Sequence, residues 1–202
     1  NSKENEPGQL PIELEIPEEI SYSQPYGLME PLDGALFSVS NQKNIGVPFS
    51  TQIIGGDLSF TIRDQKFKVP VQLFYKFNDQ VDGEVKQPFV IVPEVDLSVS
   101  KENVFLISGA EPTVTVTVNF RDQFLEGNLD FEGIDPSQFR ILSIEEVAFQ
   151  KKRIYQVAFL PNGNGKKVVT ARFTTARGKT YNQITKTISY KHIPNLTYFV
   201  PA

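Results

Sequence analysis

The chain has 202 residues, 40% of them hydrophobic and 22% charged, which is typical of a folded globular protein rather than a disordered one. Its formal net charge is −4, with acidic and basic residues spread along the chain, which disfavours a nucleic-acid-binding surface. The lack of cysteine excludes disulfides, thiolate metal sites and a cysteine nucleophile. From the pattern of apolar residues we expect neither a membrane span nor a signal peptide.

Composition and periodicity both favour β-strands. Val, Ile and Thr together supply 47 of the 202 residues, whereas Ala supplies 7. Branched side chains lose rotamer freedom in helices and pack well on strands. Apolar and polar residues alternate with a period of two, which is typical of antiparallel strands with one buried face. In chain order, these runs predict strands over 58–62, 69–77, 95–99, 114–118, 155–159 and 169–173.

Glycine-containing segments are expected to form the turns between strands, because positive φ angles cost little at glycine. The candidates are Gly55-Gly56, Asp82-Gly83, Asn162 to Gly165 and Arg177-Gly178. Pro70 lies inside a strand-like run and predicts an edge position or a bulge.

Residues 141–152 are the best helix candidate, with acidic residues early and basic residues late. The apolar positions in this segment fit a helix and a strand about equally. The surrounding strands lead us to prefer strands here.

The spacing of the strands predicts an all-β protein of two consecutive immunoglobulin-like antiparallel β-sandwich domains, because one such sandwich takes about 100 residues. We expect a flexible tail over 1–9, a first sandwich over 10–93 and a second sandwich over 94–192. Residues 193–202 are expected to begin a linker to a following domain.

Few residues suggest chemistry. His192 is the only histidine, and without a neighbouring catalytic motif it is better explained as a structural or exposed residue. Asp79, Asp82 and Glu84 surround a glycine in one turn and form a weak calcium candidate, although a simple Asp-Gly hairpin turn explains them better.

Paired carboxylates for glycoside cleavage could come from the same acids or from Glu145 and Glu146, but exposed loop acids are the simpler interpretation. Tyr26 and Tyr181 could contact a glycan by stacking on a sugar ring, although aromatic residues on strands more often belong to the core.

Four blocks resemble, in order and spacing, the region that follows the catalytic domain in exported PIG-L (LmbE-like) deacetylases of Bacteroidetes-type bacteria. The blocks are Ser23-Gln-Pro-Tyr-Gly-Leu28, Val69 to Tyr75 leading into Asp79 to Glu84, Pro88-Phe-Val-Ile-Val-Pro93, and Ile188-Ser-Tyr-Lys-His-Ile-Pro194. The chain departs from the family at Gly27, where an aromatic residue is expected, and at Gln87, where a basic residue is usual.

The resemblance implies a parent enzyme that uses zinc to remove acetyl groups from N-acetylglucosamine-like sugars. The A-H-P-D-D-E-like motif that holds the zinc in that family does not occur here, so no metal ligand is carried over and this chain is expected to be non-catalytic, with no cofactor of its own. The implied location is extracytoplasmic, either periplasmic or secreted.

The expected function is an accessory module that supports or positions the deacetylase domain on glycan substrates, with other domains of the parent chain as partners. One alternative is a carbohydrate-binding module with an exposed aromatic patch or a cleft. Another is an adhesin or assembly protein that pairs exposed strand edges with partners. An independent hydrolase is the least favoured.

Overall fold

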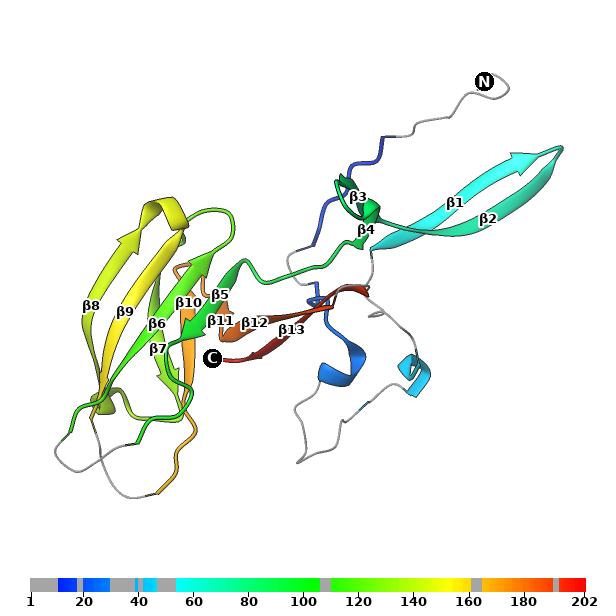
Figure 1. The fold of residues 1–202 in the computed structure, drawn as a ribbon. Coiled ribbons are helices and arrows are strands. Elements are labelled where there is room, and N and C mark those ends of the chain that lie inside the picture. The colour runs from blue at the N-terminus through cyan, green and yellow to red at the C-terminus, as the bar shows by residue number, and fades with distance from the viewer. Residues whose placement is uncertain are drawn as a thin grey trace.

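A computed structural model describes residues 11–17, 20–29, 39, 42–46, 54–105, 110–160, 165–190 and 193–202. These residues form β-strands and three-residue 3-10 helices, with no α-helix among them (Figure 1). The all-β prediction is therefore confirmed. The expected tail over 1–9 lies outside the described residues, and no helix in the described part is long and apolar enough to cross a membrane.

The strands are β1 (Gly55–Ile62), β2 (Gln65–Gln72), β3 (Phe74–Asp79), β4 (Gly83–Pro88), β5 (Val95–Val99), β6 (Thr113–Phe120), β7 (Gly127–Glu132), β8 (Phe139–Val147), β9 (Lys152–Phe159), β10 (Thr170–Thr175), β11 (Thr180–Tyr181), β12 (Gln183–Tyr190) and β13 (Ile193–Pro201). The 3-10 helices are η1 (Tyr26–Leu28), η2 (Gln42–Asn44), η3 (Pro136–Gln138) and η4 (Ala148–Gln150).

The hydrophobic core lies between two antiparallel sheets, which we call the core sheets. One has the strand order β5-β6-β9-β8, and the other has the order β11-β10-β7. Both contribute buried side chains to one cluster, in which Leu97, Val116, Val157 and Phe173 are fully buried. Burying such side chains between two sheets is the main favourable term in the stability of this part of the chain.

Strand β6 shows why the sequence folds this way. Val114, Val116 and Val118 are at most 4% exposed, while the threonines between them point to the other face of the sheet. Side chains alternate in the same way along β5, β9 and β10. The strand prediction for residues 141–152 is also confirmed, because this segment holds most of β8, the short η4 turn and the first residue of β9.

The hairpin β12–β13 is attached to the core sheets by one hydrogen bond to a side chain and one between backbone groups. The Thr185 N–H donates to the Asp96 carboxylate at 2.5 Å, and the Ala171 N–H donates to the Ala202 carbonyl at 2.8 Å. Residues 193–202, which we expected to begin a linker, therefore contain a paired strand and end against the core cluster.

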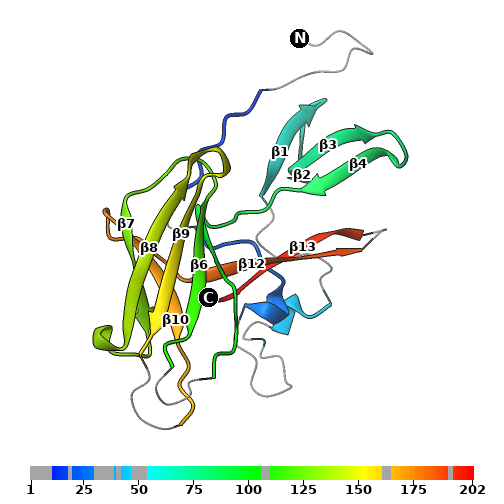
Figure 2. The same ribbon diagram turned by 60° about the vertical axis from the view of Figure 1, so that its left-hand side comes forward.

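Residues 54–90 form two separate antiparallel hairpins, β1–β2 and β3–β4, to one side of the core sheets (Figures 1 and 2). None of these residues is buried. The predicted run over 69–77 is divided at Leu73 between β2 and β3. Pro70 lies in a two-stranded sheet opposite Asp57, with no shift in register, so its predicted edge position is confirmed.

The turn of the β1–β2 hairpin consists of Arg63 and Asp64, with φ angles of +46° and +67°. The predicted turn at Gly55-Gly56 is wrong, because both glycines begin strand β1. The predictions at Asp82-Gly83 and Arg177-Gly178 are confirmed, since each glycine follows or forms part of a turn and has a positive φ. Residues 162–164 of the fourth candidate lie outside the described residues.

Replacing Gly127 by alanine should strongly destabilise the protein. A Cβ at Gly127 would lie 2.8 Å from the Phe173 ring and 2.9 Å from the Thr175 Cα, inside a well-packed core. We expect the free energy of unfolding, measured by urea denaturation, to fall by about 2–3 kcal/mol. Gly56→Ala is the matched control, because a Cβ there meets nothing within 4 Å, and its stability should stay close to wild type. Equal losses in the two variants would contradict this account.

Candidate functional site

The turn between β3 and β4 holds the calcium candidate. The Asp79 carboxylate accepts backbone hydrogen bonds from Val81 at 2.8 Å and from Asp82 at 3.1 Å, and these bonds lower the pKa of Asp79. Glu84 lies in β4 and pairs with Lys76 at 3.0 Å. The structure therefore uses Asp79 to close the turn and Glu84 to bridge strands.

Asp79, Asp82 and Glu84 are not gathered into a ligand set. Within the described ranges, no group of three or more His, Asp or Glu side chains could hold a metal ion. Glu145 and Glu146 are adjacent in β8, where alternation places their side chains on opposite faces of the strand. His192 lies outside the described residues.

The two tyrosines proposed for glycan contact lie far apart in the chain and differ in burial. Tyr181 is 3% exposed, belongs to the core cluster and donates its hydroxyl to Glu94 at 2.9 Å. A sugar ring needs an open aromatic face, so this position disfavours Tyr181 as a contact. Tyr26 lies in η1, where it is half-buried and its hydroxyl accepts a hydrogen bond from the Gly46 N–H at 3.4 Å.

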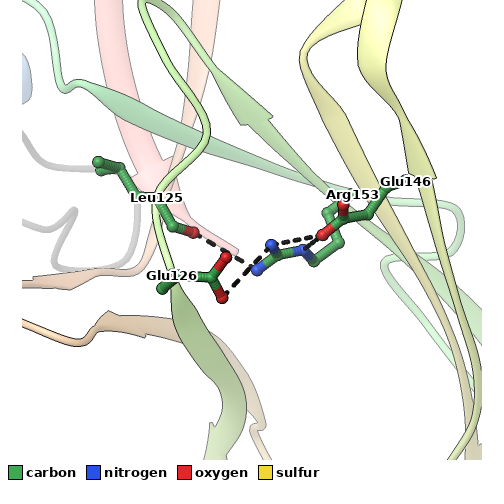
Figure 3. Close-up of polar contacts among 4 residues, drawn as sticks. All are labelled: Leu125, Glu126, Glu146 and Arg153. Atoms are coloured by element: carbon green, nitrogen blue, oxygen red, sulfur yellow. Dashed lines mark hydrogen bonds and ion pairs between the residues drawn. The ribbon is translucent and has the colours of Figure 1, made fainter.

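A buried arginine is the most elaborate polar site among the described residues (Figure 3). The Arg153 side chain is 6% exposed, and its guanidinium binds the Glu146 carboxylate with distances of 2.5 Å and 2.7 Å. The Leu125 carbonyl accepts a further hydrogen bond at 3.4 Å, and Glu126 lies 3.9 Å away. The guanidinium also lies 5.7 Å from the centre of the Phe120 ring.

Electrostatics keep Arg153 charged. Burial lowers the pKa of its guanidinium, but hydrogen bonds with Glu146 and Tyr155 and the nearby charges outweigh that effect and raise the pKa. Burial raises the pKa of the Tyr155 phenol, while the Arg153 hydrogen bond works in the opposite direction. Surrounded by carboxylates, a carbonyl and an aromatic ring, Arg153 closes one end of the core rather than offering a site for an anion.

Sequence reasoning missed Arg153, although a signal was present. In the run from Lys152 to Phe159 the arginine has the same phase as Tyr155 and Val157, so it had to share their inward face. A charge at a core position predicts a partner on a neighbouring strand. That partner is Glu146, which lies directly opposite Arg153 in the β8–β9 pairing.

One face of the β1–β2 hairpin carries mainly apolar side chains at its paired positions, with Gln65, opposite Ile62, as the polar exception. Residues 58, 60 and 62 share this face with residues 67, 69 and 71 across the hairpin. We call it the hairpin face. Its members are between 38% and 54% exposed, and they are Leu58, Phe60, Ile62, Phe67, Val69 and Val71. The opposite face is polar and includes the ion pair between Lys68 and Asp57 at 2.9 Å.

A cleft of about 240 Å³ lies between the end of β4 and the hairpin β12–β13. We call it the hairpin cleft. Its lining contains amide and hydroxyl side chains with two small apolar residues, and consists of Gln87, Pro88, Val90, Thr187, Asn195 and Thr197. None of these residues carries a charge, so the lining is suited to binding a neutral ligand rather than to acid–base catalysis.

Comparison of the chain with protein-family models, with curated proteins and with solved structures finds no match in any of the three.

The Arg153–Glu146 pair can be tested by comparing loss of one partner with loss of both. Glu146→Gln leaves a buried guanidinium with a weaker partner and should cost about 1 kcal/mol of unfolding free energy, because Glu146 is half-exposed and partly screened. Arg153→Met replaces the charge with an apolar chain of similar length and should change stability by less than that. In the Arg153→Met background, Glu146→Gln should have no further effect, and additive losses would contradict the pairing.

Tyr155 should make stability depend on alkaline pH. The raised pKa means that the folded state holds the phenol proton after the unfolded chain, whose tyrosines titrate near pH 10, has begun to lose it. The contribution of Tyr155 is therefore complete below pH 10 and declines as the pH rises further.

Urea denaturation of wild type and Tyr155→Phe across this range tests the point. The variant should be less stable by about 1 kcal/mol at neutral pH, through loss of a hydrogen bond. The gap should narrow above pH 10. A gap that stays constant would show that Tyr155 does not titrate as described.

Proposed function

We propose that this chain is a non-catalytic β-sandwich accessory module that supports a neighbouring domain of the same polypeptide. The observation that carries the proposal is the hairpin face, an exposed apolar surface on one side of a hairpin whose other side is polar. A hairpin with one apolar and one polar face is built to be covered on one side only.

The proposal includes an immunoglobulin-like sandwich for the part of the chain that holds β5 to β11. The strand orders β5-β6-β9-β8 and β11-β10-β7 support it, because they match the ABED and GFC sheets of a constant-type immunoglobulin domain. A second such domain over 10–93, which the strand spacing predicts, would need the two N-terminal hairpins to join a common core.

The size of the hairpin face favours a partner in the same polypeptide over a free one. Its six half-exposed side chains offer about 500 Å² of apolar surface, or about 1,000 Å² when both partners are counted. That value falls within the usual range for contacts between domains of one chain and below that of stable complexes between separate chains. We therefore assign the face to an apolar surface of an adjacent domain.

The sequence resemblance supports a proposal for the class of that domain. Four ordered motif blocks between Ser23 and Pro194 are similar to the region after the catalytic domain of PIG-L deacetylases, whose activity depends on zinc held by the catalytic domain itself. In this proposal the module positions the deacetylase domain on glycan substrates outside the cytoplasm, and takes no part in the chemistry.

Hydrogen exchange of the hairpin tests the proposal. In the full native polypeptide, backbone amides of β1 and β2 should exchange at least about tenfold more slowly than in the chain alone, because docking protects them. Phe60→Asp should abolish this protection. Thr61→Asp is the matched control, since it adds the same charge to the polar face opposite Lys66.

Val69→Thr provides a second variant that keeps the shape and β-propensity of the residue while adding a hydroxyl to the hairpin face. It should reduce the protection without unfolding the hairpin. Equal exchange in the chain alone and in the native polypeptide would overturn the proposal. Protection that survives both face variants would instead mean that another surface docks.

A further inference from the structure

We infer that the hairpin cleft is a binding site for a neutral saccharide. The inference is independent of the hairpin face and adds a ligand-binding role to the supporting role proposed above. It rests on the lining of the cleft, on its volume and on an aromatic ring beside it.

The cleft is formed where two parts of the chain that are distant in sequence meet, the end of β4 and the β12–β13 hairpin. Strand β4 and the residues after it supply one wall, and β12 and β13 supply the other, with β4 lying against β13 (Figure 2). Thr187 and Thr197 are directly opposite each other in the β12–β13 pairing, so their side chains emerge side by side on one face of the hairpin.

The chemistry of the lining selects an uncharged polar ligand. The Gln87 and Asn195 amides and the two threonine hydroxyls can each donate and accept a hydrogen bond, as sugar hydroxyls also do. An anionic ligand would favour arginine or lysine, and the lining has neither. A purely apolar ligand would cover four polar groups without satisfying them, which is costly.

Tyr75 provides a stacking surface next to the cleft. It lies directly opposite Gln87 in the β3–β4 pairing, so the two side chains share one face of that hairpin. The Tyr75 side chain is 57% exposed, and its ring is supported by Phe77, with ring centres 5.6 Å apart and planes 29° apart. An exposed aromatic ring beside hydroxyl-binding groups is suited to the apolar face of a sugar ring.

The volume limits the ligand to a small one. A cleft of about 240 Å³ is below the usual range for drug-sized ligands and suits a single sugar ring. With few atoms in contact, we expect a dissociation constant on the order of 1 mM for a monosaccharide. A disaccharide whose second ring reaches Tyr75 should bind more tightly.

An amide chemical-shift titration by NMR tests the inference. The probes are glucose, N-acetylglucosamine, cellobiose and the charged sugar glucuronate, added to the whole chain. At least one neutral sugar should give saturable shifts at the amides of Gln87, Thr187 and Thr197, and glucuronate should bind more weakly. No saturable shift with any neutral sugar, or tighter binding of glucuronate, would overturn the inference.

Variants locate the site. The double variant Thr187→Val with Thr197→Val keeps the branched shape while removing both hydroxyls, and should weaken binding by about tenfold or more. Tyr75→Ala should weaken the binding of the disaccharide more than the binding of the monosaccharide. Thr61→Val, on the polar face of β1, is the matched control and should bind as wild type does. Unchanged affinity in the double variant would place the sugar elsewhere.

Discussion

The packing of two sheets around Phe173 is the contact on which the rest of the described structure depends. This ring is fully buried, lies edge-on to Phe120 with ring centres 5.6 Å apart, and leaves so little space that a glycine is needed at position 127. Along β6 and β10, one strand from each core sheet, every second side chain is buried and points towards the core around this ring. Because a shift of one residue would turn these side chains to solvent, their register is strongly determined.

Polar groups close the ends of this core. At one place, Arg153 reaches from the inward face of β9 to carboxylates on β8 and on the segment before β7. At another, the Tyr181 hydroxyl binds Glu94, just before β5. These contacts add less net stability than the apolar core does, but each would leave an unsatisfied buried group if its partner were lost. They therefore favour one arrangement of the two sheets over sliding alternatives.

Alternation predicted the fold class and most strands of the core, because a half-buried strand must repeat every two residues. The same rule did not reveal the turn at Arg63 and Asp64, since the nearby glycines suggested another place for it. Residue type favoured the core for aromatic residues on strands, which is where Tyr181 lies, but it could not show that Tyr181 binds Glu94 or that Thr187 and Thr197 face Gln87 across a cleft. Those facts depend on contacts between segments about a hundred residues apart.

The turn at Arg63 and Asp64 has a consequence for how the β1–β2 hairpin behaves. Both residues adopt a left-handed backbone, which aspartate tolerates but arginine resists, so Arg63 carries strain on the order of 1–3 kcal/mol. An isolated hairpin is only marginally stable in water, so this strain shifts the element towards opening. Covering the hairpin face would then also order the hairpin. Such coupling lowers the net affinity below what the contact area alone would give, and makes the association readily reversible.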